Sequence, residues 1–338
     1  MQGGVTVISQ KLIAEKAGVS YATVSRALTH SAKVRPETIT LIRKAMKELG
    51  IDSEEQIFTG SNALSRMVMV VVGDILKDFF TNVVVGISDK LQEEGYTVVL
   101  CNSHYDADTE ISYITKATEQ RYAGIIMITV TETPELVKML QQASIPIILV
   151  NRYIRSLDLD VVRIDNYRGG YMAGQHLLDN GHRRIAHLAG PKESATTQDR
   201  LRGFADALYD RGITLDIKKD VMYGDLSRES GKTFAAYLQK NDYTAAFIGN
   251  DYMTAGTVSA LTKNNIRVPD HFSIICFDDS AIVNEDSINI TSISFNPQTM
   301  GASAAEALLN RIHDPLGQRI RTIYSPCLTD RKSVLNIT

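Results

Sequence analysis

Hydrophobic and polar positions follow two different patterns along the chain, and the change falls near residue 66. Up to about residue 50, apolar residues recur at helical spacing in three short segments. From Met67 onward, short apolar runs typical of buried strands alternate with amphipathic segments typical of helices. The pattern predicts a small all-α head followed by a larger α/β body.

The first two predicted helices lie within residues 9–28 and are joined by a tight turn. Ser9 and Ser20 each stand where a side-chain oxygen can accept a hydrogen bond from a free first-turn N–H. Gly18 suits the left-handed position that ends the first helix. This layout is a helix-turn-helix, whose second helix can enter the major groove of DNA.

The exposed face of the second predicted helix carries side chains that suit base edges. Tyr21, Ala22, Ser25 and Arg26 project together because they stand at i, i+1, i+4 and i+5. Arg26 can donate two hydrogen bonds to guanine, and Ala22 can touch a thymine methyl. An ordinary helical hairpin has a similar glycine turn, so this segment alone leaves both interpretations open. The residues expected at DNA are Ser9, Ser20, Tyr21, Ala22, Thr23, Ser25, Arg26, Lys33 and Arg35.

Charge is distributed unevenly and favours DNA as the partner of the head. Residues 1–50 hold eight of the 36 Lys and Arg residues and three of the 39 acidic residues, so the net charge is +5 there and −8 over the remainder. A basic head on an acidic body fits phosphate binding by the head alone. A third helix, begun by Pro36 and Glu37 and ended by Gly50, completes this head.

The body contains two series of predicted strands separated by predicted helices. The first series is 67–73, 97–102, 124–129, 145–151 and 161–165, and the second is 184–190, 221–225, 245–250, 272–279 and 290–295. A helix over 300–313 and a strand over 321–326 follow. The pattern predicts two similar lobes, each a doubly wound parallel sheet, and a chain of 338 residues is long enough for them.

Polar residues directly follow four of the predicted strands. They are Asp74, Asn151–Arg152, Asn250–Asp251 and Asp278–Asp279. Ligands of open parallel sheets bind beyond the carboxyl ends of the strands. Each residue taken singly could cap a loop, but four at equivalent places predict one cleft shared by the two lobes.

Several classes of protein are disfavoured. No stretch approaches the ~18 apolar residues of a membrane span, and the N-terminus does not resemble a secretory signal. The three cysteines are far apart, which is typical of free thiols in a reducing cytoplasm. The chain has no phosphate-binding loop and no metal-spaced His/Cys cluster. Adjacent Asp278 and Asp279 should point to opposite sides, which makes them a poor acid–base pair. We therefore expect a cytoplasmic protein with no catalytic site, metal, cofactor or membrane span.

These motifs resemble the lactose/galactose repressor (LacI/GalR) family of bacterial transcription regulators over nearly the whole chain. The head is similar in AEKAGVSYATVSRAL and VRPETITLIRKAMKELG. The body is similar in RIDNYRGGYMAGQHLLDNGHRRIAHLAGP, RLRGFADAL, IGNDYMTAG, VPDHFSIICFDD and LTDRKS. The resemblance implies a periplasmic-binding-protein-like core that senses a small molecule, and a homodimer that binds a near-palindromic operator in double-stranded DNA.

The resemblance also implies the domain organisation. A DNA-binding head over 1–50, a hinge over 51–66 and an effector-binding and dimerisation core over 67–338 are expected. The chain should cross between the lobes three times. The first lobe should comprise about 67–163 and 296–318, and the second about 164–295 and 319–338.

Six positions match the family's effector site. Arg200 matches the arginine that grips ligand hydroxyls or a carboxylate, and Asp278 matches the acid that accepts from hydroxyls. Leu226 falls where several sugar-binding members have an aromatic platform, which is one departure from the family. The expected effector residues are Phe79, Asn151, Arg200, Leu226, Asn250 and Asp278.

The hinge is a second departure. The family usually has Pro-Asn near residues 53–54 and a leucine that wedges into the minor groove. Here Ser53, Glu54 and Glu55 stand there, and Gly60 takes the wedge position, so weak wedging and little DNA bending are expected. Ile57 or Phe58 is the alternative wedge.

Three further expectations concern function and assembly. The leading hypothesis is a repressor whose operator affinity is controlled by a sugar or sugar-like effector. The alternatives are a solute-binding protein of the same core fold, a regulator that responds to a nucleoside or purine-type ligand, and a sugar or nucleoside enzyme. For the dimer, the helix containing Val83, Val84 and Ile87 is the expected interface.

Substitution of Arg26 by alanine tests the base-contact role. The variant should lose about 1–3 kcal/mol of binding free energy at a specific operator, because a bidentate contact to a base is removed. Binding to specific and to scrambled DNA should be measured at one salt concentration. An equal loss on both DNAs would assign Arg26 to phosphate contacts instead.

Overall fold

The computed structural model describes residues 8–20, 23–24, 27, 34–49, 57–58, 65–284, 289–315 and 317–338. The contacts divide the chain into two units, Met1–Ser65 and Arg66–Thr338, and each is described by itself.

The first unit contains helices α1 (Gln10–Ala17) and α3 (Pro36–Glu48). Gly18 ends α1 with a φ of +65°, so the predicted left-handed turn is confirmed. The Oγ of Ser20 accepts from the backbone N–H of Thr23 at 3.2 Å, which confirms the predicted cap at the start of the next helix. The core of this unit is formed by Ile13, Ala14, Val24, Ile42 and Met46.

A short parallel pairing joins the two ends of this unit. Strand β1 (Ile8–Ser9) pairs with strand β2 (Ile57–Phe58), which the sequence did not predict. The hinge positions Ser53, Glu54, Glu55 and Gly60 lie outside the described residues, so the expectation of weak wedging stays a prediction.

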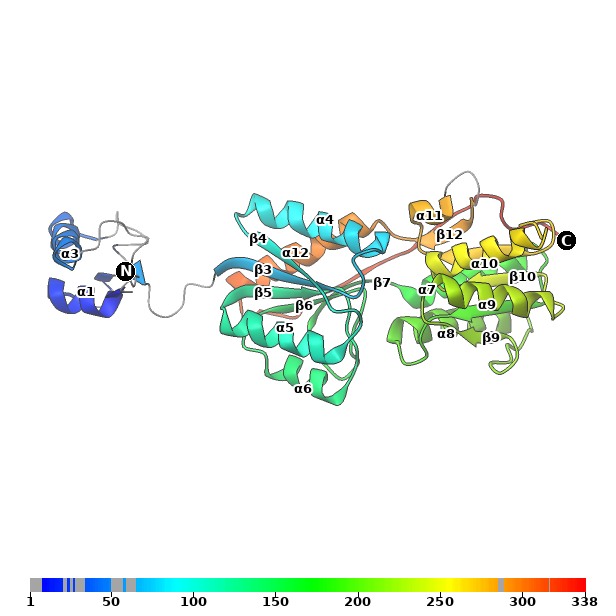
Figure 1. Ribbon diagram of the computed structural model, residues 1–338, viewed down its shortest axis with the longest axis horizontal. Helices are drawn as coiled ribbons and strands as arrows, with labels where there is room; N and C mark the ends of the chain where they lie inside the picture. Colours follow the sequence, from blue (N-terminus) through cyan, green and yellow to red (C-terminus); the bar gives the residue numbers. More distant parts are fainter. Residues whose placement is uncertain are drawn as a thin grey trace, which may run out of the picture. The chain divides into compact units, whose positions relative to one another are not determined.

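The second unit contains two six-stranded sheets among its described residues (Figure 1). The order of the first sheet is β13-β7-β6-β5-β3-β4, and that of the second is β14-β12-β11-β10-β8-β9. The strands of the first sheet are β3 (Ser65–Val72), β4 (Thr97–Asn102), β5 (Tyr122–Met127), β6 (Ile147–Val150), β7 (Asp160–Ile164) and β13 (Arg321–Tyr324). Those of the second are β8 (Ile185–Ala189), β9 (Val221–Tyr223), β10 (Ala245–Ile248), β11 (Ser273–Phe277), β12 (Thr291–Ser294) and β14 (Cys327–Thr329). The predicted pair of α/β lobes is confirmed.

Helices cover both faces of each sheet (Figure 1). Those of the first lobe are α4 (Asp78–Glu93), α5 (Ala107–Glu119), α6 (Pro134–Gln142) and α12 (Pro297–His313). Those of the second are α7 (Asn166–Asp179), α8 (Ala195–Tyr209), α9 (Arg228–Gln239), α10 (Asp251–Lys263) and the short α11 (Ala281–Asn284). In β3, Val68, Val70 and Val72 pack in the cluster of α4 and α12, whereas Met69 and Val71 pack with α5 and α6. Strands buried on both faces explain the continuous apolar runs in the sequence.

The chain passes between the sheets three times, after β7, after β12 and after β13. The third passage differs from our expectation, which placed residues 319–338 in the second lobe. Strand β13 instead pairs in parallel with β7, from Arg321 opposite Val161 to Tyr324 opposite Ile164. The reason is local, because α12 ends beside β7 and delivers the chain to that edge of the first sheet.

The dimer surface expected on α4 is partly wrong. Val83 and Ile87 are 0% exposed and lie in the core of their own chain. They face α12, which approaches so closely that a Cβ at Gly86 would lie 2.0 Å from the carbonyl oxygen of Gln298. Val84 is partly buried against the same core, and Val85 is 44% exposed. The helical stripe therefore marks intrachain packing and identifies no dimer interface.

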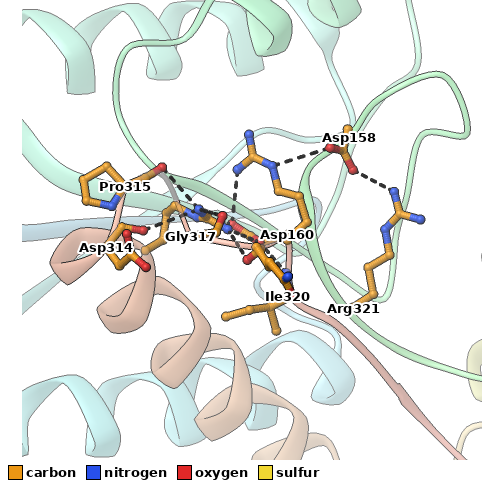
Figure 2. Close-up of polar contacts among 10 residues, drawn as sticks. Asp158, Asp160, Asp314, Pro315, Gly317, Ile320 and Arg321 are labelled. Carbon is orange, nitrogen blue, oxygen red and sulfur yellow. Dashed lines mark hydrogen bonds and ion pairs between the residues drawn. The ribbon is translucent and has the colours of Figure 1, made fainter.

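A buried ion pair fixes the end of α12 to the first sheet (Figure 2). The Arg311 guanidinium contacts Asp160 through Nε at 2.7 Å and Nη2 at 2.9 Å. The remaining N–H groups donate to backbone carbonyls of the turn, including Gly317 at 2.7 Å. Asp160 also accepts from the backbone N–H of Ile320 at 2.7 Å, just before β13. One charge pair thus holds together the end of α12, β7 and the start of β13.

Breaking this pair should destabilise the core strongly. Asp160→Asn should lower the free energy of unfolding by about 3–5 kcal/mol, since it leaves Arg311 as an uncompensated buried cation. The matched control is Asp158→Asn, because the Asp158 side chain is 71% exposed and also pairs with arginine. That variant should change stability by less than about 1 kcal/mol. Chemical denaturation of both variants can be compared, and similar losses would contradict a structural role for the buried pair.

Candidate functional site

A cavity lies where the strand ends of the two lobes meet. The six residues expected at an effector site, which come from both lobes, all line it: Phe79, Asn151, Arg200, Leu226, Asn250 and Asp278. Twelve further residues line the cavity. Arg152 and Asp251 follow predicted strands and were expected in the cleft, whereas Lys77, Tyr105, His187 and Thr196 were not predicted there.

The backbone is strained where it enters this cavity. Asn151 after β6 has a φ of 56°, and Asp278 after β11 has a φ of 69°. Leu226 and Tyr105 also have positive φ, at 67° and 59°. Leucine and tyrosine rarely adopt this conformation, and each such residue costs about 1–3 kcal/mol. Four of the nine non-glycine residues with positive φ in the described ranges line this cavity, which makes it a candidate functional site.

Arg200 of α8 is fixed on one side and free on the other. Its Nε donates to Asn166 Oδ1 at 2.8 Å, and its Nη1 donates to the carbonyl oxygen of Gly249 at 2.6 Å. The guanidinium lies 3.4 Å from the centroid of the Phe277 ring. Burial lowers the pKa of Arg200 to about 10, so the side chain stays cationic at neutral pH. Among the described residues its Nη2 has no acceptor, which leaves that group for a ligand.

Two carboxyl groups lie on the same side of the cavity. Asp251 accepts from Ser280 Oγ and from the backbone N–H of Tyr252. Burial and the neighbouring Asp278 raise the pKa of Asp251 to about 7. Burial also raises the pKa of Asp278, although Arg200 and Arg152 oppose the shift. The pair therefore carries fewer than two full negative charges near neutral pH.

Two acceptors in the cavity have no partner among the described residues. Asn151 Oδ1 is buried without a hydrogen bond. His187 is 1% exposed, and its pKa is lowered to about 4 by burial, so the ring is neutral. Its Nδ1 lies 2.9 Å from the carbonyl oxygen of Phe247 and must be the donor there. The buried Nε2 is therefore an acceptor, and it lacks a hydrogen bond.

Contacts between the lobes close the cleft. Arg152 Nη1 donates to Ser194 Oγ and, at 2.7 Å, to Thr196 Oγ1. Tyr153 OH donates to Asp199 Oδ2 at 2.6 Å, and Tyr252 OH donates to the carbonyl oxygen of Leu76 at 2.7 Å. These bonds hold the first-lobe loops against the second lobe.

Not every strand-end residue serves the cavity. Asp74 Oδ1 accepts from the backbone N–H of Leu76 at 3.0 Å and so caps its own loop. Asp279 pairs with Arg331 at 2.8 Å and is not among the residues that line the cavity. Asn250 Oδ1 caps α10 by accepting from Met253 N at 2.9 Å, although the residue lines the cavity.

The predicted DNA-contact residues are described only in part. The hydroxyls of Ser20 and Thr23 lie 2.8 Å apart at an exposed position, and Arg35 is exposed just before α3. The side chain of Ser9 is not described. Tyr21, Ala22, Ser25, Arg26 and Lys33 lie outside the described residues, so their roles stay predictions.

The cavity combines guanidinium donors, carboxyl acceptors and neutral acceptors, a set suited to a compound with several hydroxyl groups. Within the described ranges, no group of three or more His, Cys, Asp or Glu residues is placed to hold a metal ion. None of the helices in those ranges has the length and apolar character needed to cross a membrane.

Two family models match the chain. Residues 11–51 match the model described as bacterial regulatory proteins of the lacI family. Residues 65–332 match the model of periplasmic binding proteins and the sugar binding domain of the LacI family. Together they cover the head and both lobes.

Relatives match over nearly the full length. The HTH-type transcriptional repressor PurR of Pectobacterium carotovorum is 31% identical over 328 residues, 96% of each chain. The HTH-type transcriptional regulator CelR of Thermobifida fusca is 29% identical over 334 residues, 96% of this chain and 97% of that one.

Solved structures agree with this likeness. A complex of the transcriptional regulator CelR with cellobiose has a TM-score of 0.74 at 28% identity and covers 96% of this chain and 99% of that one. A LacI family regulator from Enterococcus faecium with bound ribose has a TM-score of 0.73 at 26% identity, with 80% and 100% covered.

The raised pKa of Asp251 predicts a pH dependence of stability. A folded-state pKa above the unfolded value means that the folded protein binds more protons, so this group's stabilisation is complete below about pH 4 and is lost as the pH rises through about 7. Asp251→Asn should remove that component. The free energy of unfolding of wild type and variant should be measured across this range. Parallel curves would contradict the assignment.

Proposed function

Because the chain belongs to the LacI family of bacterial transcription regulators, we propose that its effector is a small polyhydroxylated compound bound in the cavity between the two lobes. The chain is a DNA-binding transcription regulator whose operator affinity is controlled by a small molecule. Its full-length relatives are transcription regulators rather than enzymes.

The observation that carries the proposal is the set of unused polar groups in the cavity. Arg200 offers a donor, Asp278 offers an acceptor, and Asn151 Oδ1 and His187 Nε2 lack partners among the described residues. Leaving such groups buried and unpaired costs about 1–3 kcal/mol each, so a ligand with several hydroxyls gains by satisfying them. The cellobiose and ribose held by two structural relatives support a carbohydrate-like ligand.

The position of the cavity suggests how a ligand acts. A ligand that contacts residues of both lobes favours the closed cleft over an open one. The difference in its affinity for the two arrangements sets how far it can change the affinity for DNA, and the coupling is reciprocal. Arg200 and Asp278 stand in the second lobe, and Asn151 stands in the first, so one ligand can bridge them.

The head suggests the form of the DNA complex. One helix-turn-helix offers few base contacts, so we propose a homodimer that binds a near-palindromic operator, with two-fold symmetry matching that of the DNA. We also propose that the protein acts in the cytoplasm, where the operator lies.

Substitutions in the cavity separate ligand response from DNA binding. Arg200→Ala and Asp278→Ala should abolish the ligand response, because each change leaves polar groups of the cavity without a partner. Both variants should change operator affinity less than about threefold, because the head is intact. A thermal-shift screen of the full-length protein against sugars, sugar acids and nucleosides identifies the ligand, since a ligand of the folded state raises the melting temperature. Calorimetry on the variants then measures the loss.

Arg202→Ala is the matched control for this experiment. It lies on α8 like Arg200, and its side chain is 60% exposed, so it should retain ligand binding. Wild-type affinity in both cavity variants would remove the cavity from the proposal, and a nucleoside as the best ligand would replace the polyhydroxylated compound.

A further inference from the structure

Arg152 is a cation in the cleft that forms no ion pair with a carboxylate of the described residues. It is the second residue after β6, and its Nη1 donates across the cleft to the hydroxyls of Ser194 and Thr196 in the second lobe. Both partners are neutral hydroxyl groups. Within the described ranges, neither Arg152 nor Arg200 has a carboxylate oxygen within 4.0 Å, and Asp278 and Glu110 act on Arg152 from farther away. Burial disfavours this charge and lowers the pKa of Arg152.

The guanidinium of Arg152 lies beside the N-terminus of α8, which makes its positive charge less favourable. Ser194 is the N-cap of the 15-residue helix α8, and its side chain makes no capping hydrogen bond. The N-terminus of a helix carries a partial positive charge and free backbone N–H groups. A guanidinium beside it is repelled, whereas an anion would be bound by both.

Two more cations face the same cavity. Arg200 is 8% exposed, and its Nη2 has no acceptor within the described ranges. Burial lowers its pKa, and so does the charge of Arg152. The Lys77 side chain is 14% exposed, donates to Tyr105 OH at 3.0 Å and has Asp74 only at 4.0 Å. These three cations share the cavity with Asp278 and with Asp251, whose raised pKa leaves it less than a full negative charge near neutral pH.

We propose that the effector carries an acidic group, a carboxylate or a phosphate, which binds Arg152 at the N-terminus of α8. The inference rests on the proposed function and narrows its ligand to a sugar acid or a sugar phosphate. Ser194 and Thr196 hold one edge of the guanidinium, and Nε and Nη2 stay free of described acceptors. A carboxylate or phosphate can accept two parallel hydrogen bonds from such an edge. The hydroxyls of the same ligand then bind Arg200 and Asp278.

Arg152→Met isolates this charge. Methionine retains an unbranched apolar stem and removes the guanidinium, so the ligand-free variant should melt at or above the wild-type temperature. Arg152→Lys retains the charge but loses the paired donors and should bind the acidic group with intermediate affinity. Arg184→Met is the matched control, because it also removes one positive charge but from a side chain that is 56% exposed and paired with exposed Asp242.

The test begins with inorganic phosphate and malonate as probes on the full-length protein. Both anions should raise the melting temperature of wild type above that in chloride at equal ionic strength. The increase should persist in Arg184→Met and be lost in Arg152→Met. No increase in wild type, or an equal increase in Arg152→Met, overturns the proposal.

Calorimetry with pairs of related ligands then identifies the acidic group. Glucose, glucuronate and glucose 6-phosphate form one set, and ribose and ribose 5-phosphate form another. An acidic member should bind wild type about tenfold or more tightly than its neutral partner, as expected for charge-assisted hydrogen bonds. Arg152→Met should abolish that preference. Comparison of glucuronate with glucose 6-phosphate shows whether the acidic group is a carboxylate or a phosphate.

The outcomes separate this inference from the proposed function. A neutral sugar that binds wild type and Arg152→Met equally, and that loses affinity in Asp278→Ala, overturns the acidic effector but leaves the cavity as the effector site. Ligand binding that is unchanged in Asp278→Ala and Arg200→Ala overturns the proposed function itself.

Discussion

The fixed guanidinium of Arg200 is the contact on which the cavity depends. Asn166 at the start of α7, the Gly249 carbonyl after β10 and the Phe277 ring at the end of β11 all hold it. Three elements of the second lobe are therefore arranged around one charge. Those contacts use Nε, Nη1 and one face of the planar guanidinium. The Nη2 group is therefore oriented before any ligand arrives. Preorganised donors of this kind bind a ligand without a further ordering cost.

The strained strand ends serve the same purpose. Asn151, Leu226 and Asp278 adopt positive φ where their strands end, and all three line the cavity. Folding of the rest of each lobe has to offset this strain, and the burial of the apolar strands supplies such stabilisation in both lobes. The buried strands stabilise the two lobes, whereas the cleft retains unpaired acceptors and two guanidinium groups without ion pairs among the described residues, which a ligand can satisfy.

Much of the fold could be predicted because buried parallel strands produce apolar runs, and the polar residues after them mark the sheet edge. Periodicity also has a limit, since the apolar stripe of α4 at Val83 and Ile87 could not show that α12 of the same chain covers it. The sequence predicted a strand at β13 but did not indicate which of the two sheets this short strand joins. The resemblance identified six residues that line the cavity. It did not identify His187, which lies inside a buried strand, or the contact of Arg152 with Ser194, which joins positions far apart in the chain. Only tertiary structure shows those two contributions.

Crystals of the full-length protein grown with the compound that most strongly alters operator binding would test the central claim most directly. The account predicts ligand density between the lobes, with hydroxyls on Arg200 and Asp278 and further contacts to Asn151 and His187. Ligand density at another place on the protein, with the interlobe cavity unoccupied, would contradict it.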